Sequence, residues 1–483
     1  MNYGMMFRIV GRVVGIEAAV MLVPMAVSYI YGESIKGFLV AIMAALIVSV
    51  LLMTVKKPAN KMIFSKEGFA SVAASWVAIS LIGAVPFVVE GAIPNYIDAL
   101  FETISGFTTT GSSILSNIEA VDRGLLFWRS LTHWIGGMGI LVLMMAIIPM
   151  VEQYSMYLMR AEVPGPVAGK LVPKVQDSSK ILYIIYVAMT VLETIMLLLG
   201  KMPLYDAVIH AFGTAGTGGF SIRSASIGYY DSAYIEIVIG VFMALFGINF
   251  NLYFFMVLRK FKLAFRNEEL ISYLAVILFS MFTIALNIRR MYDGFGMALR
   301  RAFFQVCSII STTGYVTADF DKWPQYSRIL IVVLMFSGAC AGSTAGGMKV
   351  SRIIILLRSA QSEIKRLLRP RSYNPVIYDR EKVDQATITS TMVYFFLYMQ
   401  TVAVVSILLS FDNFDAETTV SSVITCLSNV GPGLSLVGPS GNFELFSWHS
   451  KLLLSLCMLF GRLEIFPMLM LFSPYTWKRS SKF

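Results

Sequence analysis

The segment Thr109-Thr110-Gly111-Ser112 decides the fold, because its pattern of polar residues around a central glycine occurs four times. The other copies are Thr217-Gly218-Gly219-Phe220, Thr312-Thr313-Gly314-Tyr315 and Asn429-Val430-Gly431-Pro432. Each copy follows an amphipathic stretch that is too short to span a bilayer. Polar backbone at membrane depth is costly unless it is buried in protein or lines a water-filled cavity. Four copies therefore predict one pore lined by four loops.

The composition is typical of an integral membrane protein. Of the 483 residues, 57% are hydrophobic and 14% are charged, which is more apolar material than a soluble core requires. Apolar runs repeatedly reach the ~20 residues that cross ~30 Å of hydrocarbon as a helix. The alternating segments of an outer-membrane barrel are not the dominant pattern. We interpret the first apolar run, 13–31, as a retained span because no convincing cleavage site follows it.

The chain divides into two opening spans and four similar units. The opening spans are near 6–31 and 37–55. Each unit has a span, a short helix, a glycine loop and a second span. The predicted short helices are Tyr96 to Phe107, Leu204 to Gly213, Gly296 to Ile310 and Asp415 to Ser428. The predicted unit spans are 69–91 and 124–150, 181–200 and 232–258, 270–288 and 328–357, and 390–410 and 449–472.

The predicted fold class is thus an all-α membrane protein with four span–pore-helix–loop–span repeats around one pseudo-fourfold pore, plus two N-terminal spans. The predicted boundaries are 1–66 for the opening spans and 67–150, 177–262, 263–360 and 384–477 for the four repeats. The third repeat contains an interruption of its second span.

The net charge of +10 is better explained by membrane topology than by nucleic-acid binding. Lysine and arginine gather in loops between spans, where they set orientation, and they predict cytoplasmic N- and C-termini. Four residues would then lie on the outer side: Arg289, Arg290, Arg300 and Arg301. The nearby candidates to pair with them are Asp293, Asp319 and Asp321.

The glycine loops suit cation coordination. A potassium ion in a pore exchanges its water shell for protein oxygens, which rings of backbone carbonyls supply. Glycine permits a positive φ without steric penalty, so Gly111, Gly219, Gly314 and Gly431 are the candidates for such a ring. The negative C-terminal ends of the short helices would favour a cation there, and Asn95 and Asp415 are suitable N-caps. The alternative is that these glycines only permit close helix packing.

Several longer segments resemble the TrkH/KtrB superfamily of potassium transporters, and most closely its bacterial TrkH members. Besides the four loops, they are 129–139 (RSLTHWIGGMG), 218–221 (GGFS), 340–349 (CAGSTAGGMK), 429–433 (NVGPG) and 461–464 (GRLE). The resemblance covers essentially the whole chain. The two opening spans are also similar to TrkH, since KtrB-type members lack them.

The resemblance implies potassium uptake through a channel-like filter within one subunit. It implies a homodimer in the bacterial cytoplasmic membrane, surrounded by lipid and gated by a cytosolic nucleotide-binding ring of the TrkA type. Potassium would be the transported ion rather than a cofactor, and its ligands would come from the four loops quoted above. Family members with serine at the first filter glycine tend to pass sodium, so Gly111 favours potassium. The fourth loop departs from Thr-x-Gly, which leaves open whether Asn429 or Val430 contributes oxygen.

The segment Gly342-Ser343-Thr344-Ala345-Gly346-Gly347 interrupts the second span of unit three. By resemblance it is the gating loop below the filter, and close packing is the alternative. Arg462, deep in the last span, is expensive there and needs a reason. Its family counterpart faces the pore, whereas a structural pair with Glu464 is the other interpretation. The basic loops 151–180 and 358–389 are candidate docking sites for the ring or ordinary solvated segments.

Other chemistry is weakly indicated. An enzyme is not expected, since no nucleophile–base set stands out and His133, His210 and His449 have no metal or haem spacing. The four cysteines lie in apolar stretches and are expected to be buried thiols. Glu193, within a predicted span, keeps open a proton- or sodium-coupled symporter as the alternative function. A membrane subunit of a redox complex is a third, less favoured hypothesis.

Overall fold

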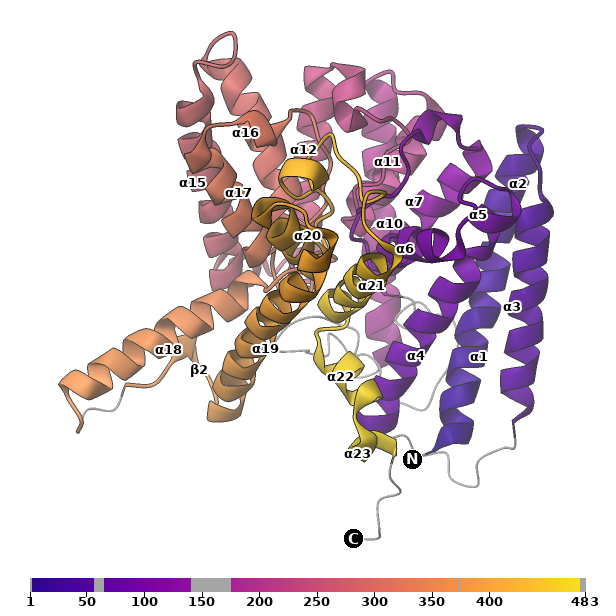
Figure 1. Cartoon of the computed structure of the whole chain (residues 1–483). Coiled ribbons are helices and arrows are strands. Elements are labelled where there is room, and N and C mark those ends of the chain that lie inside the picture. The colour runs from indigo at the N-terminus through magenta and orange to yellow at the C-terminus, as the bar shows by residue number, and fades with distance from the viewer. Residues whose placement is uncertain (1, 56–64, 140–174, 372–373, 478–483) are drawn as a thin grey trace.

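The computed structural model describes residues 2–55, 65–139, 175–371 and 374–477, and most of these residues are helical (Figure 1). Within them, the strands are β1 (Ile377–Tyr378) and β2 (Glu381–Lys382), an antiparallel hairpin in which Ile377 is opposite Lys382.

The α-helices are α1 (Tyr3–Val20), α2 (Leu22–Ile30), α3 (Lys36–Thr54), α4 (Ser65–Gly83), α5 (Val85–Val89), α6 (Tyr96–Phe107), α7 (Arg123–Met138), α10 (Val175–Leu199), α11 (Leu204–Gly216), α12 (Ala233–Phe246), α13 (Phe250–Val257), α14 (Phe261–Phe265), α15 (Glu268–Ile288), α16 (Phe295–Ile310), α17 (Gln325–Ser337), α18 (Val350–Leu368), α19 (Gln385–Leu409), α20 (Ala416–Ser428), α21 (Trp448–Arg462), α22 (Phe466–Phe472) and α23 (Pro474–Trp477). The 3₁₀ turns are η1 (Ile118–Ala120), η2 (Ser226–Tyr230), η3 (Phe320–Lys322), η4 (Ser410–Asp412) and η5 (Ser435–Val437).

Six helical segments among the described residues are long and apolar enough to cross a membrane. They are Tyr3–Ile30, Lys36–Thr54, Glu67–Val89, Ser179–Leu199, Glu268–Ile288 and Gln385–Asp412, and they match six of the ten predicted spans. Their outward side chains are apolar: Leu51 is 63% exposed, Phe396 66% and Ile407 67%. Large exposed apolar surfaces mark contact with protein or lipid, so these helices are those of a membrane protein.

Of the other four predicted spans, three are interrupted or bent and one is described only in part. The span predicted at 232–258 consists of α12 and α13, which meet at 93°, so this apolar stretch is bent. The span predicted at 328–357 is broken between α17 and α18, as its glycine-rich segment predicted. The span predicted at 124–150 is helical as far as Met138, and 140–150 lie outside the described residues.

The last predicted span, 449–472, is also interrupted. It ends at Arg462 and restarts at Phe466 as α22. Glu464 and Ile465 between the two helices both have φ of 60°. Pro467 explains the break, because proline lacks the N–H of a helix interior and clashes with the preceding turn.

The four short helices form where the sequence places them: α6, α11, α16 and α20. The prediction that Asn95 and Asp415 are N-caps is confirmed, since their side chains accept from the backbone N–H of Ile97 and Thr418. Both are polar residues that satisfy an otherwise unpaired N–H at a helix start. Helix α11 runs three residues beyond the predicted Gly213, to Gly216.

The described ends of the chain meet at one end of the molecule. The Tyr3 and Trp477 rings stack with centroids 6.1 Å apart, and the Tyr3 hydroxyl donates to the Trp477 carbonyl at 3.0 Å. In Figure 1, α1 and α3 lie together at one edge beside α4, and α15 to α17 lie at the opposite edge. Helix α18 projects sideways from the body of the molecule.

The partners of the predicted outer arginines differ from the expectation. Arg300 and Arg301 both pair with Glu236 of α12, at 3.3 and 2.9 Å, and not with the aspartates proposed from the sequence. Asp321 pairs with Arg328, and Asp319 pairs with Lys322. Glu236 is buried, and a buried carboxylate requires a cation or hydrogen bonds. Arg289 and Arg290 are exposed.

Candidate functional site

The four glycine segments share one backbone geometry. Each central glycine has a positive φ: 81° at Gly111, 75° at Gly219, 83° at Gly314 and 102° at Gly431. Two residues earlier, each segment has a second left-handed residue, Thr109, Thr217, Thr312 or Asn429, with φ between 55° and 57°. Left-handed residues at alternate positions turn successive carbonyl groups toward the same side, and glycine adopts this conformation at no steric cost.

The connection from each short helix to its glycine segment also has the same hydrogen bond in all four copies. The residue before each glycine donates its N–H to the carbonyl five residues upstream, which terminates the helix with a left-handed cap. The four bonds are Thr110 to Ser105 (2.9 Å), Gly218 to Gly213 (2.8 Å), Thr313 to Ser308 (2.8 Å) and Val430 to Thr425 (3.0 Å). The fourth segment, although its sequence departs from Thr-x-Gly, therefore has the backbone of the other three.

The segments contact one another in a closed cycle. A Cβ placed on Gly111 would lie 2.1 Å from the Gly218 carbonyl oxygen, and one on Gly219 would lie 1.9 Å from that of Thr313. A Cβ on Gly314 would lie 2.1 Å from the Val430 oxygen, and one on Gly431 would lie 2.8 Å from the Thr110 oxygen. Each carbonyl that precedes a glycine thus fills the space against the glycine of a neighbouring segment. At the fourth position this carbonyl is that of Val430.

The Asn429 side chain has a different task. Its amide donates to the Thr110 hydroxyl and to the Met458 carbonyl, each at 2.9 Å. It thereby ties the fourth segment to the first segment and to α21. The oxygen of the fourth segment that is equivalent to the others in this cycle of contacts is the backbone oxygen of Val430.

The four glycine segments together form a ring. A hollow of about 160 Å³ opens on one side of this ring. It is lined by residues of all four segments, among them Ser112, Phe220, Gly314 and Pro432, and by the connecting segments that follow them. Near its rim, the Ser224 hydroxyl and N–H donate to the Glu119 carboxylate and hold the pKa of Glu119 below its ordinary value. The rim therefore keeps this negative charge in mildly acidic solution.

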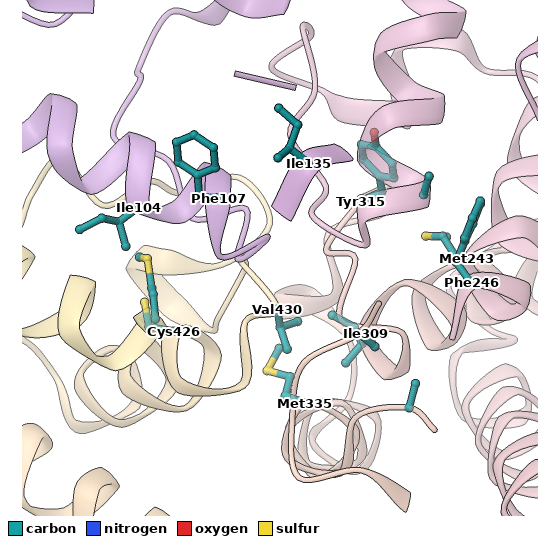
Figure 2. Close-up of a cluster of buried hydrophobic side chains, with 14 of the residues drawn as sticks. Ile104, Phe107, Ile135, Met243, Phe246, Ile309, Tyr315, Met335, Cys426 and Val430 are labelled. Carbon is teal, nitrogen blue, oxygen red and sulfur yellow. The ribbon is translucent and has the colours of Figure 1, made fainter. Parts of the chain in front are cut away.

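Apolar side chains pack around the ring from several directions (Figure 2). Ile104 and Phe107 come from α6, Ile309 from α16 and Val430 from the fourth segment, and all are buried. The four short helices present their C-terminal ends to the ring, so the negative ends of their dipoles favour a cation there.

A buried ion pair supports the first two segments. Arg129 of α7 donates to Glu102 of α6 at 2.6 Å and to the Ser221 carbonyl at 3.0 Å. Its guanidinium lies 3.4 Å from the centroid of the Phe220 ring. The other Glu102 oxygen accepts from the Ile114 N–H at 2.9 Å. One pair therefore joins two neighbouring short-helix units of the ring.

His133 provides a second support that we did not expect from the sequence. Its Nδ1 lies 2.7 Å from the Gly106 carbonyl, and the Phe220 N–H donates to its Nε2 at 3.3 Å. A carbonyl can only accept, so Nδ1 carries the proton and Nε2 is the acceptor. Arg129 and His133 both lie in the quoted stretch 129–139, and an arginine inside a largely apolar run was the available signal for this support.

The other side of the ring is covered by the segment between α17 and α18, residues 338–349. The Gly346 N–H donates to the Thr312 hydroxyl at 2.7 Å. A Cβ on Gly346 would lie 2.4 Å from the Ser428 carbonyl oxygen. The segment is thus in direct contact with the third and fourth glycine segments, on the side away from the hollow.

Arg462 lies beside this covering segment. Its guanidinium donates to the Thr344 carbonyl at 2.7 Å, to the Gly137 carbonyl at 2.6 Å and to the Thr109 hydroxyl at 3.3 Å. Glu464 forms an ion pair with Arg352. Arg462 therefore joins segment 338–349 to the first glycine segment.

Glu193 of α10 is also buried, against Thr214 of the second short helix. It is not among the residues that line the hollow. The four cysteines are buried and free, as predicted.

A model of the TrkH family, described as a cation transport protein, matches residues 34–292 and 269–479 of this chain. The chain belongs to the TrkH family. The Trk system potassium uptake proteins TrkH of Salmonella typhimurium and Escherichia coli are each 34% identical to it over 485 residues, which covers 99% of this chain and 100% of theirs. The crystal structure of the potassium transporter TrkH from Vibrio parahaemolyticus matches with a TM-score of 0.88 and 30% identity, over 99% of this chain and 100% of that one. Membership of TrkH, a transporter family, makes this chain a transport protein and not an enzyme.

We predict that Arg129→Leu destabilises the protein. It leaves Glu102 buried without its cation, and removal of one partner of a buried pair costs about 3–5 kcal/mol. Thermal unfolding in detergent, followed by size-exclusion chromatography, measures the loss. The matched control is Glu102→Met with Arg129→Leu, which removes both charges and should recover part of the lost stability. A double variant less stable than Arg129→Leu alone would contradict this explanation.

Proposed function

We propose that the chain takes up potassium through a pore whose selectivity filter is the ring of four glycine segments. The filter residues are Thr109, Thr110, Gly111, Ser112, Thr217, Gly218, Gly219, Phe220, Thr312, Thr313, Gly314, Tyr315, Asn429, Val430, Gly431 and Pro432. The closed cycle of contacts between neighbouring segments carries this proposal. Potassium is the ion named for the TrkH relatives.

The geometry supplies what a dehydrated cation needs. Backbone carbonyls can replace its water shell when several of them face one axis, and the alternating left-handed residues give four chain segments this property. The pore is then built from four span–pore-helix–loop–span repeats within one chain, with α6, α11, α16 and α20 as pore helices. The hollow lined by Ser112 and Phe220 is its outer entrance.

We predict that Gly111→Ser lowers the selectivity for potassium over sodium. A serine side chain would displace the Gly218 carbonyl, since even a Cβ would lie 2.1 Å from that oxygen. The distorted ring would fit potassium less well, and we expect a fall in the permeability ratio of about tenfold, equivalent to about 1.4 kcal/mol. Potassium and sodium fluxes into liposomes containing the purified protein measure this ratio.

The matched control is Gly296→Ser in α16. A Cβ there meets nothing within 4 Å, so the selectivity should stay at the wild-type value. Unchanged selectivity in folded Gly111→Ser would show that the ring does not choose the ion.

The second part of the proposal is a gate on the inner side. The gate consists of Gly342, Ser343, Thr344, Ala345, Gly346 and Gly347, together with Arg462. The segment covers the ring, and Arg462 adds a positive charge below it, which opposes passage of potassium. Opening requires the segment to leave Thr312 and Arg462, and two arrangements of one loop are a common form of switch.

We predict that Arg462→Ala raises potassium flux in the absence of any partner protein. The change removes the charge and the bonds to Thr344 and Thr109, which hold the gate against the filter. A several-fold rise in flux into liposomes is expected. Lys451→Met is the control, since Lys451 is a buried cation on the same helix that pairs with Asp98 instead. Equal flux through wild-type and Arg462→Ala protein would remove Arg462 from the gate.

The cellular setting completes the proposal. The chain is a homodimer in the bacterial cytoplasmic membrane with both termini in the cytoplasm, and the meeting of Tyr3 and Trp477 supports a common side. A cytosolic TrkA-type nucleotide-binding ring acts on the gate. Of its two candidate docking loops, 358–389 contains the end of α18 and the β1–β2 hairpin, whereas most of 151–180 lies outside the described residues.

The buried carboxylate of Glu193 is the observation that favours the alternative, a coupled symporter. A potassium gradient across liposomes separates the two functions. A channel-like pore lets potassium run only to the limit set by its own electrochemical gradient. Accumulation beyond that limit when a proton or sodium gradient is imposed would establish coupling.

A further inference from the structure

Glu269, near the start of α15, holds both ends of segment 338–349. One of its carboxylate oxygens, Oε1, accepts from the Ala341 N–H at 2.8 Å and from the Ser351 N–H at 2.9 Å. Ala341 lies at the start of the segment and Ser351 lies just after its end, in the first turn of α18. The Glu269 side chain is buried.

This contact substitutes for a missing cap. The N-cap residue of α18, Lys349, makes no side-chain capping bond, and its φ is 71°. The first N–H groups of a helix need acceptors, and a carboxylate is favoured there by charge and by the helix dipole. Glu269 supplies this acceptor from another helix. Because the same oxygen also holds Ala341, the two ends of the segment are drawn together at one point.

Other bonds anchor the segment to the bend between α12 and α13. The Cys340 N–H donates to the Gly247 carbonyl and the Phe250 N–H donates to the Gly342 carbonyl, each at 3.0 Å. Residues 343–347, between these anchors and Ser351, are the part that touches the filter and Arg462. A loop fixed at both ends can move in its middle, but it opens fully only if an end is released.

The residue before Glu269 contacts α18 and the β1–β2 hairpin. Glu268 pairs with Arg358 of α18 and accepts from the Asp379 N–H of the β1–β2 hairpin at 3.0 Å. The Asn267 side chain donates to the Asp379 carboxylate at 3.1 Å. One turn of chain at 267–269 therefore touches the hairpin, α18 and both ends of segment 338–349.

We propose that Glu269 is the positioning residue of the gate, a clasp that keeps segment 338–349 closed under the filter and that is released when α18 and the hairpin move. The proposal rests on the gating role of 338–349 proposed above. It assigns to Glu269 a contact that exists in the closed arrangement and is lost in the open one. Glu268 transmits displacement of the hairpin and α18 to this clasp.

Three substitutions at Glu269 distinguish the effect of side-chain length from the effect of the carboxylate charge. Glu269→Ala removes the acceptor. Glu269→Asp keeps the charge but withdraws the carboxylate by one methylene, whereas Glu269→Gln keeps an oxygen at the same reach without charge. The clasp predicts that partner-free potassium flux rises most for Ala, by about tenfold or more, next for Asp and least for Gln. A carboxylate needed only for its charge would reverse the order of Asp and Gln.

Labelling of native cysteines reports the loop position independently of flux. Cys340 lies within the segment and is buried, while Cys307, Cys426 and Cys457 are buried in α16, α20 and α21. N-ethylmaleimide modification, measured at each cysteine by mass spectrometry, should be faster at Cys340 in Glu269→Ala than in wild type. The other three cysteines are internal controls and should label at the wild-type rate.

The outcomes are distinguishable. Increased flux and selective labelling of Cys340, with Gln near wild type, support the clasp. Unchanged flux and labelling in Glu269→Ala, while Arg462→Ala raises flux, overturn the clasp and leave the gate intact. No rise in either variant overturns the gating role of 338–349 itself. If Glu269→Ala does not fold, the order of Asp and Gln decides.

Discussion

Backbone carbonyl groups that follow the end of a helix inside a membrane protein have no helical N–H to pair with, and they need another partner. This requirement determines the structure at the centre of the molecule. Four segments turn their carbonyls toward one another by the same alternation of left-handed residues. A Cβ at any central glycine would meet a neighbouring carbonyl, so glycine at all four places allows the segments to approach one another this closely. In the bilayer, unpaired carbonyls are tolerated only beside water, protein or an ion. In the proposed pore, a cation on the axis would satisfy all four segments at once.

The surrounding structure positions this ring. The pair of Glu102 and Arg129 and the imidazole of His133 link the first two segments, and Asn429 links the fourth to the first. These contacts involve residues that are far apart in the chain. They make the ring one unit, while its two faces differ. One face opens to the hollow, and the other is covered by segment 338–349 and Arg462.

Local features of the fold were predictable from the sequence. The short helices and the caps Asn95 and Asp415 depend on neighbouring residues, and glycine at 342–347 signalled a broken span. The break before Pro467 also had a local signal, although the apolar run concealed it. Contacts between units could not be predicted. Glu236 is 65 residues from Arg301, and no sequence pattern near either residue indicates that the two form a pair. The contacts of Glu269 could not be predicted either, because its partners are backbone N–H groups, which do not depend on residue type.

The most direct test of the account is to locate the ion. Rubidium or thallium has a size close to that of potassium and an anomalous signal that crystals of the protein can reveal. The account predicts peaks on the axis of the ring, at coordination distance from the carbonyl oxygens of Thr110, Gly218, Thr313 and Val430. Strong peaks elsewhere in the molecule with none on this axis, in crystals soaked at saturating ion concentration, would contradict it.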